Sequence, residues 1–247
     1  MLYLWDMQNL LIILPFLFST IQAEDCSPPE HTTADLRNAL SVSPVVDAET
    51  TPGSTLADNS FEAKGLRAEV FAKAKTAFHK AWEKGDTRKT TYTIIDYSLG
   101  SDKKRMWIID MDTGELLYHQ HVTHGKNSGL KHVETMSNVN NSKTSNIGLL
   151  KTGETYYGKH GLSLKLDGLE KGFNDNARSR YIVMHGASYA TEAYVKARGR
   201  AGRSWGCPAI DPAMTKEIIH KLKGGTLLFG YYPDTQWLGN STYLKED

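Results

Sequence analysis

The 247-residue sequence has little cysteine, little net charge and a single long apolar run. Two cysteines, Cys26 and Cys207, cannot form a disulfide-rich scaffold or a four-cysteine zinc site. Lysine and arginine total 29 against 28 aspartate and glutamate residues, and this net charge of +1 argues against a general nucleic-acid binder. One apolar run excludes a membrane protein with several spans. The 40% hydrophobic and 23% charged content is typical of a soluble globular protein with an ordinary core.

The apolar run, LLIILPFLFSTIQA, ends at Ala23 near the start of the chain. It has roughly 14 residues, whereas a bilayer-spanning helix needs about 20. A small residue followed by Glu24 and Asp25 suits a signal-peptide cleavage point, although residues 1–9 hold no lysine or arginine. We therefore expect residues 1–23 to be a cleaved signal peptide and the protein to be exported, with no membrane span after cleavage. A retained N-terminal anchor is the alternative.

The remainder of the chain divides by composition into four segments. Residues 24–58 are rich in proline, serine and threonine and are predicted to be a flexible linker. Residues 59–85 predict an amphipathic helix that packs on the domain after it and ends at a glycine. Its stripe of apolar residues recurs at every fourth position, at Leu66, Val70, Ala74, Phe78 and Trp82. Residues 90–235 form the main domain, and residues 236–247 are expected to be a C-terminal tail.

The main domain is predicted to be mostly β with peripheral helices. Runs rich in β-branched and aromatic residues predict strands at Tyr92–Tyr97, Met106–Asp110, Leu116–Thr123, Leu162–Leu166, Tyr181–Met184 and Thr226–Tyr231. The glycine- and asparagine-rich stretch from Gly125 to Gly148 is expected to form long surface loops. Asp211 and Pro212 predict a helix start, because aspartate caps free N–H groups and proline fits the first turn.

The segment with the clearest chemical pattern begins at His185-Gly186 and reaches Gly206-Cys207. A cysteine thiol needs a neighbouring base to become a nucleophile near neutral pH, and histidine supplies one. Gly206 would let the backbone approach a substrate carbonyl, and the Cys207 N–H is a natural oxyanion donor. Pro208 has no N–H to offer. The alternative is a small buried cysteine beside an unrelated histidine.

Two other motifs are weaker. Residues 202–206 fit the nucleophile-elbow pattern G-x-S-x-G, but His220 is the sole histidine after them, which disfavours a serine hydrolase. His119, His121 and His124 could be metal ligands. Because no carboxylate accompanies them at a metal-binding spacing, we interpret them as a polar strand surface and expect no metal and no other cofactor.

A run of cations precedes Cys207, with no acidic residue between Glu192 and Asp211. It contains Lys196, Arg198, Arg200 and Arg203. Such a run is usually a solvated loop. It could also stabilise a thiolate or receive the carboxylates of an anionic substrate.

These motifs together resemble the L,D-transpeptidases with a YkuD-like catalytic domain. The hallmark of that family is His-Gly followed, after a variable loop, by Ser-x-Gly-Cys, where x is most often histidine. Here His185-Gly186 and Ser204-Trp205-Gly206-Cys207 occupy those places. The context from Thr144 to Ala187 is similar to the branch described as the murein L,D-transpeptidase catalytic domain. The resemblance covers about residues 90 to 235 and implies a β-sandwich or barrel-like domain.

The resemblance also implies an activity and a partner. It implies a periplasmic or cell-envelope enzyme that acts on peptidoglycan stem peptides. Cys207 would attack the carbonyl of the third residue, release D-alanine and pass the acyl group to an amine, giving a 3→3 cross-link. His185 would be the base, oriented by the Gly186 carbonyl, and Ser204 would shape the loop. Carbapenems would acylate the same cysteine.

The chain departs from the family pattern at two places. Trp205 stands where most members have histidine, and Ala209 lacks a polar anchor for the donor stem. Arg203 or Arg200 could replace that anchor. These two arginines, Trp205 and Tyr157 are the predicted substrate-binding residues.

Three alternatives stay open. One is L,D-carboxypeptidase or endopeptidase activity on the same substrate. Another is a peptidoglycan-binding protein that has lost activity. The third is a disulfide between Cys26 and Cys207, which would silence the nucleophile but which nothing in the sequence requires. A monomer is expected.

Overall fold

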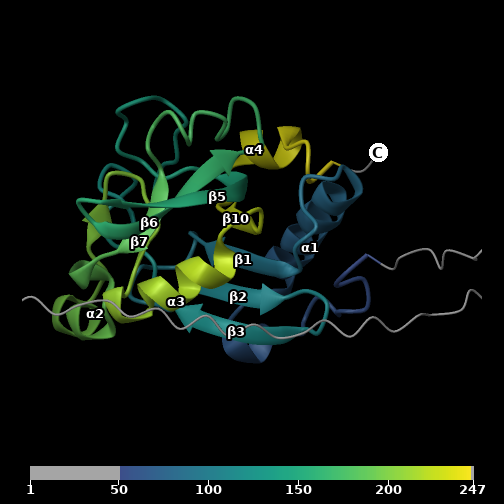
Figure 1. Cartoon of the computed structure of the whole chain (residues 1–247), viewed down its shortest axis with the longest axis horizontal. Coiled ribbons are helices and arrows are strands. Elements are labelled where there is room, and N and C mark those ends of the chain that lie inside the picture. Colours follow the sequence, from purple (N-terminus) through teal and green to yellow (C-terminus); the bar gives the residue numbers. More distant parts are fainter. Residues whose placement is uncertain (1–50, 246–247) are drawn as a thin grey trace, which may run out of the picture. The chain divides into compact units, whose positions relative to one another are not determined.

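The computed structural model describes residues 51–245. The predicted signal peptide, most of the predicted linker and Cys26 lie outside these residues. The described chain is mostly β with peripheral helices, as predicted, and ten strands carry the fold (Figure 1). The strands are β1 Thr91–Asp96, β2 Met106–Asp110, β3 Glu115–Gln120, β4 His124–Gly125, β5 Gly148–Gly158, β6 Gly161–Gly168, β7 Val183–Gly186, β8 Arg203–Ser204, β9 Ala209–Ile210 and β10 Leu227–Tyr231. The helices are α1 Ala68–Glu83, α2 Glu192–Arg198, α3 Pro212–Leu222 and α4 Thr235–Asn240, with 3₁₀ turns η1 Glu62–Lys64 and η2 Ser188–Ala190.

Eight strands form one sheet that nearly closes on itself. Their order is β3-β2-β1-β10-β5-β6-β7-β9, and β4 pairs with β8 in a separate parallel pair. The two edge strands approach each other, because Thr123 follows β3 and bonds to Ala209 of β9. The Thr123 N–H donates to the Ala209 carbonyl at 3.0 Å, and the Ala209 N–H donates to Thr123 Oγ1 at 3.1 Å. The sheet is therefore barrel-like, as the resemblance implied, and its seam lies two residues from Cys207.

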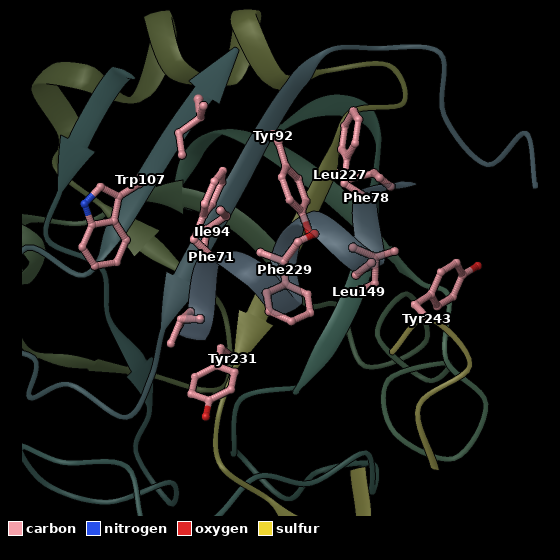
Figure 2. Packing of buried hydrophobic residues seen from close by; sticks show 14 of the residues in the cluster. Phe71, Phe78, Tyr92, Ile94, Trp107, Leu149, Leu227, Phe229, Tyr231 and Tyr243 are labelled. Carbon is pink, nitrogen blue, oxygen red and sulfur yellow. The ribbon is translucent and has the colours of Figure 1, made fainter. Parts of the chain in front are cut away.

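The centre of the sheet is the parallel pair β1 and β10, in which Tyr92 aligns with Leu227. Every residue of both strands is buried. This burial on two faces reflects two cores, since α1 packs on one face and α3 lies against the other (Figure 1). Figure 2 shows the first core, where Phe71 and Phe78 of α1 lie among aromatic side chains of β1 and β10.

The predicted amphipathic helix at 59–85 is shorter in the structure. The α-helix begins at Ala68, after a 3₁₀ turn that stops at Gly65, whose φ of 79° is left-handed. Leu66 therefore precedes the helix, although its side chain is buried. The buried face is wider than the predicted stripe and consists of Val70, Phe71, Ala74, Ala77, Phe78 and Ala81.

Both segments flanking the main domain pack more closely than the sequence predicted. The end of the predicted linker contacts α1, because Lys75 Nζ donates to the Leu56 carbonyl at 2.8 Å. The predicted tail at 236–247 is wrong as far as residue 245. It contains most of α4, where Trp237 is fully buried and its Nε1 donates to Glu170 Oε2 at 3.1 Å. Two aromatic residues, Trp237 and Tyr243, in a short stretch without apolar periodicity were too weak a signal to predict this packing.

The other elements agree with the sequence in part. The six predicted strands are present with shifts of a few residues, and α3 starts at Pro212 with Asp211 accepting from the Ala213 N–H. The expected loops occupy residues 126–147. Strand β5 and helix α2 were not predicted. Within residues 51–245, no helix is long and apolar enough to cross a bilayer.

Candidate active site

A cavity of about 640 Å³ lies beside the seam of the sheet. Of the predicted site residues, it brings together His185, Ser204, Trp205, Arg203 and Cys207. Residues that the sequence did not single out also line it: Asn141, Tyr156, Gly158, Lys159, His160, Ser163, Arg180, Tyr181, Val183 and Tyr189.

The register of the sheet places His185 near the thiol. His185 of β7 aligns with Ser163 of β6 on one side and with Ala209 of β9, two residues after Cys207, on the other. The Val183 N–H approaches Cys207 Sγ at 3.5 Å. Because side chains alternate along a strand, Val183 and His185 lie on the same face of β7. The imidazole and the thiol therefore enter one cavity.

Backbone contacts fix the orientation of the His185 ring. His185 is buried, and its Nδ1 lies 3.0 Å from the Gly186 carbonyl oxygen. Since a carbonyl can only accept, Nδ1 carries the hydrogen and Nε2 keeps a lone pair in the neutral ring. Gly186 is also required for packing, because a Cβ there would lie 2.6 Å from Thr215 Oγ1 on α3.

A second imidazole covers the first. His160 lies in the turn between β5 and β6, and its ring stacks on His185 with centroids 4.3 Å apart and planes 21° apart. Burial lowers the pKa of His185, and the nearby His160 and Lys159 lower it further, against the Gly186 hydrogen bond. These effects favour the neutral form of the His185 imidazole.

Burial has the opposite effect on the thiol. It raises the pKa of Cys207, while the N–H groups of Val183 and Cys207 and the Arg180 charge partly oppose that rise. A raised thiol pKa beside a lowered imidazole pKa describes a neutral resting pair rather than an ion pair.

The loop that carries Cys207, residues 204–208, is held by its own serine. Ser204 Oγ donates to the Cys207 carbonyl at 2.6 Å and accepts from the Gly206 N–H at 3.0 Å. Gly206 has a φ of 125°, and a Cβ there would lie 2.5 Å from the Thr144 carbonyl oxygen. Because the Gly206 N–H is already bonded and Pro208 has none, the Cys207 N–H is the loop's candidate oxyanion donor.

Arg180 holds the neighbouring loop at 137–146, whose Thr144 carbonyl lies against Gly206, and no sequence pattern predicted this role. Its guanidinium donates to four oxygens, which are Ser137 O at 2.5 Å, Thr144 O at 2.7 Å, Asn146 Oδ1 at 3.0 Å and Ser142 Oγ at 3.0 Å. All four partners lie more than 30 residues earlier in the chain. Only the folded chain brings them together.

The four predicted substrate-binding residues are placed differently. Arg203 lines the cavity, but its Nη1 donates to the carbonyls of Lys126 and Gly129 at 2.8 and 3.2 Å. Arg200 bonds to the carbonyl of its neighbour Ala201 and does not line the cavity. Trp205 lines the cavity and is 67% exposed.

Tyr157 is 79% exposed and lies outside the cavity, whereas Tyr156 lines it. Tyr156 aligns with Ser163, which in turn aligns with His185, so these three residues share a face of the sheet. A shift of one residue along a strand moves a side chain to the other face.

The three histidines considered as metal ligands have separate partners. His119 Nε2 and His121 Nδ1 contact the Lys104 and Lys103 carbonyls at 2.8 and 3.1 Å. His124 is buried, and its Nδ1 accepts from Arg105 Nη2 at 2.7 Å. Burial and the Arg105 charge lower the pKa of His124 to about 4. In residues 51–245, no cluster of three or more histidine, cysteine or acidic side chains could hold a metal ion.

Comparison with known proteins identifies the family. Among solved structures, the chain is similar to an L,D-transpeptidase from Mycobacterium smegmatis at 13% identity, covering 58% of this chain and 59% of that one, with a TM-score of 0.37. It is also similar to the helical cell shape determining protein Pgp2 from Campylobacter jejuni at 9% identity, covering 66% and 57%, with a TM-score of 0.40. The chain spans less than two-thirds of either structure. No curated protein matches. The sequence profile of the L,D-transpeptidase catalytic domain matches residues 62–231, which is most of the sequence, and the chain therefore belongs to that family.

Proposed function

We propose that this protein is a peptidoglycan L,D-transpeptidase whose nucleophile is Cys207. One observation carries the proposal. The Cys207 thiol shares a cavity with His185, and the Gly186 carbonyl holds that imidazole in the tautomer whose Nε2 can accept a proton. A pair of neutral groups in this arrangement suits general-base attack on an amide carbonyl.

The proposed first step is acylation by a donor stem tetrapeptide. The Cys207 sulfur attacks the carbonyl carbon of the third, diamino acid residue, and its proton passes to His185 Nε2. The Cys207 N–H stabilises the resulting oxyanion. As the C–N bond breaks, His185 returns the proton to the departing D-alanine amine, and a thioester remains on Cys207.

The proposed second step transfers the acyl group. The amine of an acceptor stem attacks the thioester, gives up a proton to His185, and leaves with the acyl group in a 3→3 cross-link. The returning proton restores the thiol. If water replaces the amine, the same thioester gives a shortened stem, and the protein is an L,D-carboxypeptidase or endopeptidase.

We further propose where the reaction occurs. The chain is exported, residues 1–23 are removed, and the mature protein acts as a monomer in the periplasm or cell envelope. Its partners are the donor and acceptor stem peptides of peptidoglycan.

Intact mass after exposure to imipenem tests the nucleophile, since a related structure is an LD transpeptidase in complex with imipenem. We expect one covalent adduct on the wild-type protein and none on Cys207→Ala. Cys26→Ala is the matched control and should react as the wild type does. An adduct that persists in Cys207→Ala would overturn the assignment.

Incubation with purified stems, followed by analysis of the products, tests the acceptor. Dimers indicate transpeptidation, and shortened monomers indicate hydrolysis. Binding to sacculi with neither product would favour the peptidoglycan-binding alternative instead.

A further inference from the structure

The walls of the active-site cavity carry an unbalanced charge. A smaller hollow of about 210 Å³ adjoins the cavity and shares Asn141, Arg180, Tyr181 and Trp205 with it. The residues lining the two spaces include four lysines and arginines, namely Lys143, Lys159, Arg180 and Arg203, but no aspartate or glutamate. A concave surface of one charge sign attracts ligands of the other sign.

Two of these four cations are already occupied by protein oxygens. Arg180 donates to four oxygens of the loop at 137–146, and Arg203 donates to two carbonyls. The ammonium groups of Lys143 and Lys159 have no carboxylate partner within residues 51–245. Both instead lie over the Trp205 ring, at 4.8 Å and 5.9 Å from its centroid. These two lysines are therefore available to a ligand.

Three separate segments bring this group together. Lys143 comes from a surface loop, where it adopts a φ of 58° that is uncommon for a side-chain-bearing residue, and its carbonyl accepts from the Asn127 N–H at 3.1 Å. Lys159 comes from the turn between β5 and β6. Trp205 comes from the loop at 204–208, two residues before Cys207. The indole thus gathers two like charges from segments that are distant in the chain.

We propose that Lys143, Trp205 and Lys159 form a clamp that binds a carboxylate of the peptide substrate. This inference rests on the proposed function, since it assigns the recognition element for the same donor stem. Two ammonium groups at 4.8 and 5.9 Å from one indole centroid leave two positive charges without a carboxylate at that ring, and a carboxylate bound there lowers their electrostatic energy. The family usually has histidine where this chain has Trp205, so the clamp is a feature of this chain that the shared motif does not supply.

A donor tetrapeptide offers carboxylates from two sources close to the scissile bond. One is the C-terminal carboxylate of the fourth residue, which departs with D-alanine. The other is the free carboxylate on the side chain of a diamino acid such as diaminopimelate. The chemistry that the clamp recognises is the same in both cases.

Peptide binding to the full chain carrying Cys207→Ala tests the clamp without turnover. The probes are a diaminopimelate tetrapeptide, the same peptide with a C-terminal amide, and the same peptide with an amide on the diaminopimelate side chain. K143Q/K159Q is expected to weaken binding of the unmodified tetrapeptide by about tenfold, the combined effect of two partly exposed ion pairs. K143R/K159R should retain binding because it keeps both charges, and K216Q on the exposed face of α3 is the control.

If K143Q/K159Q no longer weakens the binding of one amidated peptide, the carboxylate replaced in that peptide is the one that the clamp binds. Equal affinity for all three peptides, or an equal loss for all three in K143Q/K159Q, would overturn the clamp. Measuring D-alanine release by the protein with Cys207 intact distinguishes failure of the clamp from failure of the proposed transpeptidase function. Normal release by K143Q/K159Q means that the clamp fails and the function stands. Lysine-dependent binding without any release from the wild type means that the function fails and the clamp stands.

Discussion

The hairpin of β5 and β6 has charged residues at both ends, and the two ends differ in whether those charges have ion-pair partners. Toward its base, Arg178 pairs with Glu154 and Asp167, and Lys165 also pairs with Glu154. At its turn, Lys159 has no carboxylate partner in the described chain and lies over Trp205. Both ends are hollowed, with volumes of about 530 Å³ at the base and about 640 Å³ at the active site.

Cavity volume therefore does not separate these two regions, whereas their chemistry does. At the base, acidic and basic side chains line the cavity together, namely Asp86, Glu154 and Asp167 with Arg88, Lys89, Lys151 and Arg178. The hydrogen bonds from Arg178 and Lys165 hold the pKa of Glu154 well below its usual range. At the turn, the Cys207 thiol, the His185 imidazole and two ammonium groups lie along cavities whose lining includes no acid. Charge of a single sign therefore distinguishes the end at which we propose that the substrate binds.

The largest expected effect is at His185, the proposed general base for Cys207. His185→Gln should lower the rate of imipenem adduct formation by about 10²- to 10⁴-fold, because the proton of the attacking thiol loses its acceptor. Time-resolved intact mass measures the rate, and thermal unfolding checks that the variant is folded. His220→Gln, on the exposed face of α3, is the matched control. A loss smaller than tenfold would mean that another group takes the proton.

Arg180 lines the cavity, but its guanidinium already donates to four protein oxygens. We therefore expect it to support the structure of the site rather than to bind substrate. Arg180→Met should lower the free energy of unfolding by about 1–3 kcal/mol, because partly buried oxygens such as Thr144 O lose a charged donor. The acylation rate should fall with it, since Gly206 packs against that same oxygen. Urea denaturation measures the first quantity. Arg180→Lys should restore the charge near Cys207 but not the forked contacts. Unchanged stability in Arg180→Met would contradict this role.

The neutral resting pair predicts how the thiol responds to pH. Because burial raises the pKa of Cys207, its alkylation by iodoacetamide should rise about tenfold per pH unit through neutrality, with a midpoint above the 8.5 or so of a free cysteine. Acylation by substrate should instead be lost on acidification through the lowered pKa of His185, below its ordinary value of about 6.5. A thiolate plateau at pH 6 to 7 would show an ion pair instead.

The smallest effect is expected at the base of the hairpin. Arg178→Gln should lower the melting temperature only slightly, and less so at high salt, because exposed ion pairs contribute little. The rate of imipenem adduct formation should stay as in the wild type. A clear loss of acylation in this variant would show that the two ends of the hairpin are coupled.

The sequence predicted elements whose signals are local. Strand β2 matches its predicted bounds, and α3 begins at Pro212 because the capping aspartate and the first-turn proline are adjacent in the chain. The pairing of a histidine with Cys207 was also accessible, since the motif that carries it spans a short segment. Strand β5 was missed because glycine and charged residues interrupt its apolar positions.

What the sequence could not predict depends on contacts between distant segments. Lys143 and Lys159 are unremarkable in a chain with 29 cations, and only the fold places both over Trp205. Tyr157 was predicted instead of Tyr156 because the face that a strand residue occupies depends on register with β6, which no local pattern reveals.

The pairing of β1 with β10 has a consequence for the order of folding. Tyr92 and Leu227 are register partners at the middle of the sheet, yet most of the described chain lies between them. Closing so long a loop costs entropy before the pairing returns any stability, and such topologies fold slowly. The two cores and the seam beside Cys207 are completed only when these distant strands meet. The proposed export requires the chain to cross a membrane before it folds. Slow pairing of these strands would then keep the Cys207 thiol away from His185 until the chain has been exported.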